Sequence, residues 1–193
     1  MTIQRCGWCS NDPLYTAYHD DEWGKPVHDE ALLFEMLCLE GQQAGLSWIT
    51  VLKKRQAYRA HFFQYPIEQI AQLTDAEILL KQQNTQLIRH LGKLTAIRDN
   101  ARAWLQLKQQ GIDVVTWLWS FAAQPRLNNN IPDYRQAPAQ TQESQHMSKT
   151  LKKHGFKFVG PTICYAFMQA VGMVDDHENH CTFKTPPLPS DKS

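Results

Sequence analysis

The chain has 193 residues, enough for one domain with a hydrophobic core, and its formal charge of +1 neither indicates nor excludes a nucleic-acid partner. No apolar stretch is long enough to cross a bilayer, and the first residues lack the apolar run of a signal peptide, so we expect a cytoplasmic protein without membrane contact. Five cysteines, an odd number in such a chain, favour thiols or metal ligands over a framework of disulfide bonds.

The predicted elements are almost all helices joined by short connections, so we expect an all-α fold. The helices are indicated by apolar residues at helical spacing, by capping residues such as Asp29, Ser47 and Thr74, and by prolines in first turns. In chain order, they are expected at 28–40, 47–62, from 66 onward, at 74–80, 93–110, 117–121, from 143 onward and at 160–171.

Three segments interrupt the helical pattern. Residues 87–93 are expected to form a hairpin between two helices, and the polar stretch 124–141, with its three prolines, an exposed loop or mobile excursion. The tail at 184–193 is expected to be disordered. We therefore expect a single domain over residues 1–183, followed by this tail, with a monomer as the simplest assembly.

Soft metal ligands stand near both ends of the chain. His177 and Cys181 are four residues apart, so they share one face of a helical turn and can face one ion. Near the amino terminus stands Cys6, and the other ligand is either Cys9, in a Cys-x-x-Cys pair, or His19. Spacing alone favours Cys9. The pattern indicates one zinc site that joins the two ends of the chain.

Glu40 carries a carboxylate on an apolar helix face. It follows Leu33, Met36 and Leu37 by seven, four and three residues, so it shares their stripe. One interpretation is that the carboxylate is buried or faces a cavity, where a bound cation would favour its charged form. The alternative is a side chain at a helix end whose tip reaches water.

The segment 41–48 connects two predicted helices. It contains two glycines, two amide side chains and Trp48, which let a backbone approach a ligand and offer hydrogen bonds and a stacking plane. We interpret it as a recognition loop. The alternative is a tight turn between helices with Trp48 in the core.

Long motifs across most of the chain resemble the 3-methyladenine DNA glycosylase I family. They lie at 5–8, 13–24, 39–55, 155–160 and at the pair His177 and Cys181. The resemblance implies a helix-hairpin-helix DNA glycosylase with a structural zinc that joins the amino- and carboxyl-terminal segments. It also implies that the protein flips an alkylated base out of double-stranded DNA and hydrolytically releases free 3-methyladenine. We expect a monofunctional enzyme without a lyase step.

The same resemblance assigns the metal ligands. It implies that one structural Zn²⁺ is held by Cys6, His19, His177 and Cys181, so that Cys9 takes no part. Four protein ligands would close the coordination sphere and leave no position for an activated water.

The resemblance implies a base pocket lined by Glu40, Tyr18 and Trp48. Trp8 is a further candidate for stacking on the base, and Glu40 is the candidate catalytic residue. Because 3-methyladenine is cationic while it is attached to the sugar, it is a good leaving group, and a carboxylate at Glu40 would favour positive charge on the base.

Contacts with the DNA are expected from two groups of residues. Ala44, Gly45 and Leu46 are candidates to fill the gap left by the flipped base. Phosphate contacts are expected from Lys53, Arg55, Gly92 and Lys157, although such charge runs are also typical of solvated helix faces.

The predicted hairpin lacks the Gly-x-Gly of a strong helix-hairpin-helix signature. Lys93 follows it, where bifunctional relatives use a lysine for Schiff-base chemistry, and we expect Lys93 to be a surface or phosphate-binding residue instead.

Two other functions remain open from the residues alone. One is a zinc-stabilised helical module that binds DNA without cleaving a bond. The other is a redox protein built on Cys6 and Cys9, which lacks the strand-helix pattern expected of a thioredoxin-like fold.

Overall fold

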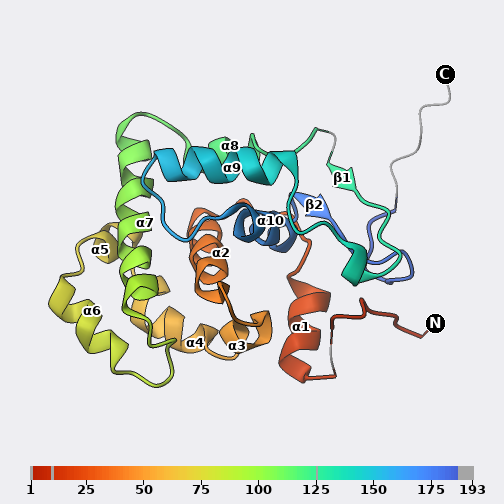
Figure 1. Ribbon diagram of the computed structural model, residues 1–193, viewed down its shortest axis with the longest axis horizontal. Coiled ribbons are helices and arrows are strands. Elements are labelled where there is room, and N and C mark those ends of the chain that lie inside the picture. The colour runs from red at the N-terminus through yellow and green to blue at the C-terminus, as the bar shows by residue number, and fades with distance from the viewer. Residues whose placement is uncertain (1, 10, 125, 187–193) are drawn as a thin grey trace.

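The centre of the molecule is α2 (Glu30–Gln43), with α7 (Leu91–Gln109) and α10 (Pro161–Ala170) packed against it and α9 (Gln142–Lys153) against α10 (Figure 1). Leu33, Leu37 and Leu39 of α2 are fully buried in the core that these helices share. The computed structural model describes residues 2–9, 11–124 and 126–186. None of the helices within these residues has the length and apolar character needed to cross a bilayer.

Shorter elements surround this centre. They are α1 (Pro13–Asp21), α3 (Trp48–Leu52), α4 (Arg55–Tyr58), the π-helical turn η1 (Arg59–Phe63), α5 (Ile67–Ala71), α6 (Asp75–Gln82), α8 (Val114–Trp119), the 3₁₀ turn η2 (Tyr134–Gln136), and the two-residue strands β1 (Leu127–Asn128) and β2 (Val174–Asp175). The prediction of a helical fold is confirmed, and the two short strands are the exception to it among the described residues.

Predicted caps begin two of the helices. The Asp29 side chain accepts a hydrogen bond from the Leu32 amide at 2.8 Å, so α2 begins where the sequence indicates. Thr74 and Glu77 form a reciprocal capping box at the start of α6. These local contacts satisfy amides that have no partner within their own helix.

The single helix predicted over 47–62 is divided into α3, α4 and η1. Buried polar contacts with α2 accompany the break. The Arg55 guanidinium donates to Glu35 at 2.6 Å, and the Tyr58 hydroxyl donates to the Gln42 side chain at 2.9 Å. Arg55 and Tyr58 are three residues apart on α4, so one face of this short helix makes both contacts with α2.

Part of the predicted excursion at 124–141 is held against the body of the protein. β1 pairs with β2 in parallel, with Leu127 opposite Val174 and Asn128 opposite Asp175, and an isolated bridge joins Ile131 to Glu178. Leu127 and Asn128 are exposed as expected, but the expectation of a loop is wrong for them because they form a paired strand, and Ile131 is buried. Pairing with a segment almost fifty positions later cannot be read from local composition.

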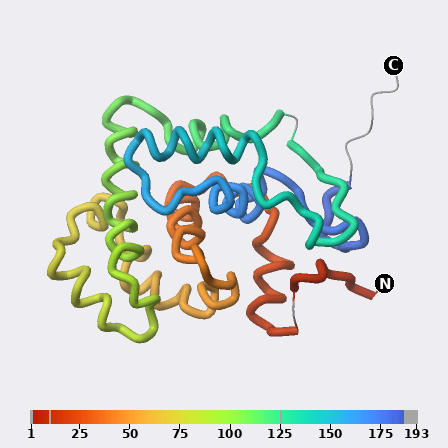
Figure 2. The backbone as a smooth tube through the Cα atoms, in the orientation of Figure 1, coloured from red at the N-terminus to blue at the C-terminus, as the bar shows by residue number. Residues whose placement is uncertain are grey.

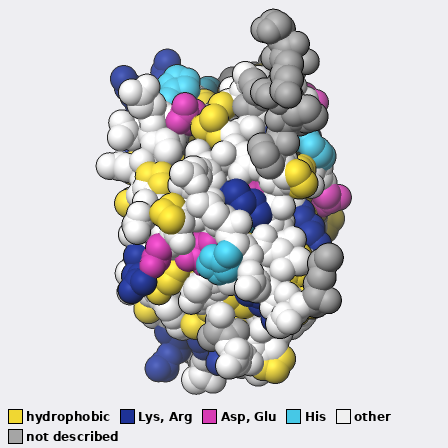
Figure 3. Space-filling view, turned by 90° about the vertical axis from the view of Figure 1, so that its right-hand side faces the viewer, with side chains coloured by type: hydrophobic (Ala, Val, Ile, Leu, Met, Phe, Trp, Pro, Cys, Tyr) yellow, Lys and Arg dark blue, Asp and Glu magenta, His cyan; other side chains and the backbone are white. Residues whose placement is uncertain are grey.

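The two ends of the described chain lie on the same side of the molecule (Figure 2). The Thr182 amide donates to the Gln4 carbonyl oxygen at 2.9 Å. The first residues of the predicted disordered tail are also held, since the Lys184 ammonium donates to the Asn129 and His177 carbonyl oxygens at 2.7 Å each. Residues 187–193 of that tail lie outside the described residues. On this side, basic side chains are interspersed with acidic ones (Figure 3).

Candidate metal cluster and ligand pocket

Three buried residues from the two ends of the chain form a cluster that could hold a metal ion. The ligand atoms of Cys6, His19 and Cys181 all lie within 4.8 Å of one another. Cys6 precedes α1, His19 lies in the last turn of α1, and Cys181 follows β2. The cluster therefore joins the segments that the sequence predicts to be joined by a metal.

Two carboxylates orient the imidazole rings around this cluster. Asp20 lies 2.8 Å from His19 Nδ1, and Asp175 lies 2.8 Å from His177 Nδ1. A carboxylate on one ring nitrogen is the usual partner of a metal-bound histidine, because it leaves the other nitrogen for the metal. Nε2 of His177 is buried and has no hydrogen-bond partner among the described residues.

The donor set fits a thiolate-binding metal. The hydrogen bond between the two thiols raises the pKa of Cys6 and lowers the pKa of Cys181, which favours one thiolate. His177 lies outside the 4.8 Å group, with its ring 5.3 Å from the His19 ring between centroids. Its unpartnered Nε2 makes it the candidate fourth ligand. Cys9 lies outside the group as well, and its thiol donates to the Tyr15 carbonyl oxygen at 3.8 Å.

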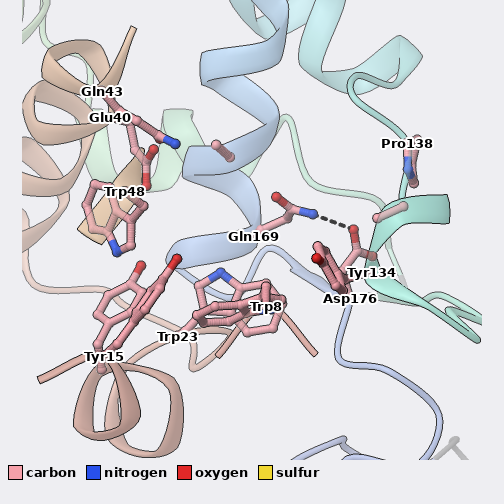
Figure 4. A pocket seen from close by; sticks show the side chains of 13 residues that line it. Trp8, Tyr15, Trp23, Glu40, Gln43, Trp48, Tyr134, Pro138, Gln169 and Asp176 are labelled. Carbon is pink, nitrogen blue, oxygen red and sulfur yellow. Dashed lines mark hydrogen bonds between the residues drawn. The ribbon is translucent and has the colours of Figure 1, made fainter. Parts of the chain in front are cut away.

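A cavity of about 290 Å³ opens beside the cluster (Figure 4). It contains the four residues predicted for the base pocket, together with others that the sequence did not indicate. Its lining is Trp8, Tyr15, Tyr18, Trp23, Glu40, Gln43, Trp48, Tyr134, Ala137, Pro138, Ala166, Gln169 and Asp176. This volume is at the small end of the range for small-molecule sites, which suits a ligand the size of one nucleobase.

Two buried polar atoms at one end of the cavity lack partners. Glu40 is only 3% exposed, and its Oε2 has no hydrogen-bond partner in the described part of the chain. The same holds for the indole Nε1 of Trp48, whose ring lies beside Glu40 with Nε1 on the side nearer Tyr15 (Figure 4). Buried polar groups are rarely left unpaired, so an unpaired carboxyl oxygen and an unpaired indole N–H on two residues that line one cavity indicate a site completed by a ligand.

Burial of Glu40 raises the pKa of its carboxyl group to about 8. The sequence left open whether this side chain is buried or reaches water at a helix end, and the structure shows that it is buried. At neutral pH, the carboxyl group of the empty pocket is therefore mostly protonated. A cation placed beside it would lower this pKa and favour the carboxylate.

Aromatic rings form the walls of the cavity and connect it with the metal cluster. Tyr18 and Trp48 lie 5.3 Å apart between ring centroids. Trp8 lies 5.0 Å from Trp23, and Trp23 in turn lies 4.6 Å from the His177 ring. The indoles of Trp8 and Trp23 are therefore a wall that the cavity and the cluster share.

Sequence reasoning missed several lining residues. Tyr15 precedes Tyr18 by one helical turn, so helical spacing could have identified it. Asp176 is buried at the far end of the cavity, where it accepts hydrogen bonds from Tyr165 at 2.6 Å and Gln169 at 2.7 Å. Tyr134 belongs to the segment taken for an exposed loop, and no local signal indicates its place in the cavity wall.

Two of the predicted DNA-facing regions are exposed. Gly45 has φ +77°, and Leu46 is 42% exposed in the turn between α2 and α3, close to Glu40 and Trp48 in the chain. Gly92 and Lys157 lie far apart in sequence but line one shallow hollow of about 500 Å³ beside the start of α7. The structure therefore brings these two residues together.

Two basic residues predicted to contact phosphate have other partners. Lys53 is exposed and forms an ion pair with Asp12 at 2.8 Å. Arg55, predicted to contact phosphate, is 4% exposed and lies between Glu22 and Glu35, each at 2.6 Å. An arginine held this way supports the packing of α1 and α4 on α2 and has no guanidinium face available for DNA.

The prediction of Lys93 as a surface or phosphate-binding residue is wrong, because its side chain is buried. It is 6% exposed, and its ammonium donates to the Gln42 and Ala44 carbonyl oxygens at 2.8 and 2.6 Å. The sequence could not indicate this, because both acceptors are backbone atoms of a helix end some fifty residues earlier.

The chain is similar to proteins of one family over almost its whole length. The sequence profile of the family described as methyladenine glycosylase matches residues 8–185. DNA-3-methyladenine glycosylase 1 of Escherichia coli (strain K12) is 52% identical over 93% of this chain and 96% of the relative. DNA-3-methyladenine glycosylase of Haemophilus influenzae (strain ATCC 51907 / DSM 11121 / KW20 / Rd) is 51% identical over 94% and 98%.

A crystal structure of 3-methyladenine DNA glycosylase I has the same fold. It superposes with a TM-score of 0.91 at 52% identity and covers 94% of this chain and 100% of that protein. With its helical core, its cluster of cysteine and histidine ligands and its aromatic cavity around Glu40, the chain belongs to the methyladenine glycosylase family.

Proposed function

We propose that this protein is a DNA-3-methyladenine glycosylase, which removes 3-methyladenine from alkylated double-stranded DNA by hydrolysis of the N-glycosidic bond. The observation that carries the proposal is the cavity in which the Glu40 carboxyl group and the Trp48 indole N–H are buried without partners among the described residues. Membership of the methyladenine glycosylase family supports 3-methyladenine as the base that would pair with these two polar groups.

The charge of the lesion explains why a buried carboxyl group suits this reaction. 3-Methyladenine is cationic while it is attached to the sugar, so it leaves without a strong general acid. In the pocket, the cationic base lowers the pKa of Glu40, so that the carboxyl group loses its proton to solvent and the resulting carboxylate pairs with the base. Ordinary adenine in DNA is neutral and gains no such ion pair, so Glu40 discriminates between the two bases.

The aromatic side chains hold the flipped base. Trp48 and Trp8 offer indole faces for stacking, and the Trp48 N–H offers a donor at the edge of the base. Tyr18 is buried, and burial raises its pKa well above the usual range, so its hydroxyl group is neutral and acts as a hydrogen-bond donor or acceptor.

The metal of the cluster is one Zn²⁺ ion with a structural role. Cys6, His19, His177 and Cys181 would hold it, because two cysteines and two histidines are a common donor set for structural zinc. Zinc bound by four protein ligands has no open position for water, so it supplies cross-linking of the two chain ends and no chemistry.

DNA is held at two places on either side of the flipped nucleotide. Leu46, carried by Ala44 and Gly45, enters the gap in the duplex. Gly92 and Lys157 contact phosphates at the start of α7, with Lys53 as a further cationic contact. The reaction is hydrolytic without a lyase step, since the Lys93 ammonium is occupied by two carbonyl oxygens.

The test is release of the free base from methylated DNA. The metal-loaded protein should release 3-methyladenine, identified by chromatography and mass spectrometry, and borohydride should trap no covalent adduct with the DNA. Folded, metal-loaded protein that binds the DNA but releases no base would instead be a binding module. An adduct trapped by borohydride would contradict the hydrolytic mechanism.

A further inference from the structure

A buried lysine connects the two regions that we propose to contact DNA. Lys93 lies in the first turn of α7, directly after Gly92. Its ammonium donates to the carbonyl oxygens of Gln42 and Ala44, at the end of α2 and in the following turn. In return, the Gln42 side-chain amide donates to the Lys93 carbonyl oxygen at 2.9 Å. These three hydrogen bonds form a reciprocal link between α2 and α7.

The position of Lys93 is unfavourable for its own helix. The amino end of a helix carries partial positive charge, so a cation in the first turn of α7 is repelled there. Burial also disfavours the charge and lowers the pKa of Lys93. The carbonyl end of α2 offsets both costs, because its last carbonyl groups lack helical partners and carry partial negative charge. Lys93, a residue of α7, thus caps the carboxyl end of α2.

The turn that follows α2 has few contacts of its own. Gly45 has φ +77°, and no heavy atom would lie within 4 Å of a side chain added there. Leu46 is exposed, and its amide donates to the Gln43 carbonyl oxygen at 2.6 Å. The contact of Lys93 with the Ala44 carbonyl oxygen is therefore a principal link between this turn and the rest of the protein.

We propose that Lys93 is a positioning residue for base extrusion, which holds the turn Ala44–Gly45–Leu46 in a fixed place relative to the phosphate-binding start of α7. With this link, binding of the DNA backbone beside Gly92 places Leu46 at the gap left by the flipped base. Lys93 touches neither the base nor the sugar, and it acts through the turn. The inference rests on the proposed glycosylase function.

The test compares two lysine-to-methionine substitutions on α7. Lys93→Met removes the ammonium group and keeps an unbranched apolar side chain. Lys108→Met is the matched control, because Lys108 lies near the other end of α7 and forms an ion pair with Glu30 at 2.9 Å. Both variants lose the same charge, so an effect of net charge on DNA binding would be equal in the two.

We expect Lys93→Met to slow excision from DNA without weakening the binding of free 3-methyladenine. Single-turnover excision of 3-methyladenine from DNA should fall at least tenfold in Lys93→Met and stay within twofold of wild type in Lys108→Met. The affinity for free 3-methyladenine, followed by tryptophan fluorescence, should stay within twofold in both, because the pocket itself is intact. Unchanged excision in Lys93→Met would overturn the inference, and so would an equal loss of excision and free-base affinity.

A second measurement separates this inference from the proposed function. Hydrogen exchange of the Leu46 amide should be at least tenfold faster in Lys93→Met than in Lys108→Met, since the turn loses its link to α7. Unchanged exchange would overturn the inference. If wild-type protein releases no base, the glycosylase function fails, and the exchange rates still decide whether Lys93 holds the turn. Lys93→Gln, which keeps one amide donor, replaces Lys93→Met if the latter does not fold.

Discussion

The metal cluster and the base pocket lie side by side and share the indoles of Trp8 and Trp23, yet their polar groups are arranged in opposite ways. In the cluster, Asp20 and Asp175 hold Nδ1 of the two histidines, so Nε2 of each ring is left for a metal ion. In the pocket, Glu40 and Trp48 line the cavity, and the Glu40 Oε2 and the Trp48 N–H are buried without partners among the described residues. The donor atoms of the first site could hold a metal ion permanently, whereas on the proposed function the second site would be completed only while a base is bound.

The largest effect is expected from loss of a cluster ligand. His19→Ala should lose stoichiometric metal and destabilise the protein by several kcal/mol, roughly 3 or more, because metal binding contributes to folding. Free-base affinity should fall as well, since Trp23 packs on the His177 ring. Cys9→Ser is the control and should keep its metal. Metal analysis measures the metal content of the two variants, and thermal unfolding measures their stability. Loss of metal in Cys9→Ser with retention in His19→Ala would contradict the ligand assignment.

A smaller effect is expected at Glu40, and it depends on pH. The pKa of Glu40 is raised to about 8 in the folded protein, so the stability that its protonated form contributes is complete below about pH 4.5 and is lost as the pH rises through 8. Between pH 5 and 8, wild type should therefore lose roughly 2–4 kcal/mol more stability than Glu40→Gln. Urea unfolding at several pH values measures this difference.

Glu35→Gln is the control for this pH dependence. Glu35 lies on the same helix and is buried, but it is paired with Arg55 and Arg59. The Glu35→Gln substitution should lower stability by roughly 3 kcal/mol, because it leaves the buried Arg55 guanidinium with Glu22 as its one remaining carboxylate partner among the described residues. Equal pH dependence in wild type and Glu40→Gln would show that the Glu40 carboxyl group is not desolvated in solution.

Substitution of Gly24, which lies beside His177, should weaken metal binding without removing a ligand. A side chain at Gly24 would lie 2.7 Å from Cε1 of His177, so Gly24→Ala should displace this ring and weaken metal binding about 10-fold to 100-fold. Gly111→Ala is the matched control, because Gly111 has a similar φ of +79° and no neighbour within 4 Å of the added atom. Competition with a chelator measures the affinity, and equal values in the two variants would exclude His177 as a ligand.

The smallest effect is expected from the indole N–H of the pocket. Trp48→Phe removes a buried donor that has no partner within the described chain, so stability should change by less than about 1 kcal/mol while free-base affinity falls several-fold. Trp104→Phe removes a donor that is bonded to Glu30 at 2.8 Å, and it should lower stability by about 1–2 kcal/mol without affecting base binding. The opposite pattern would mean that the Trp48 N–H already has a structural partner.

The sequence indicated those parts of the fold that depend on local rules. The caps at Asp29 and Thr74 and the stripe that buries Glu40 follow from helical geometry, and the structure confirms them. Local rules failed where a residue's partner lies far along the chain. Spacing favoured Cys9 as a ligand over His19, because a Cys-x-x-Cys pair is visible locally, while the direction in which α1 presents His19 depends on how it packs.

The same limit applies to charged residues. Arg55 and Lys93 look like surface cations in the sequence, but each is buried by acceptors on α2 that only the fold brings near. The sequence did not predict Tyr134 as a lining residue of the cavity, because its segment is held in place by the pairing of β1 with β2. Such contacts depend on non-local pairing, and no periodicity in one sequence reports them.

The most direct test of the central claim is single-turnover release of 3-methyladenine by wild type and Glu40→Gln, both with stoichiometric metal. We expect wild type to release the base, and Glu40→Gln to release it more slowly by on the order of 10²-fold with the same metal content and fold. Equal release rates would contradict the claim that the buried carboxyl group in the aromatic pocket, separate from the metal cluster, recognises the cationic base.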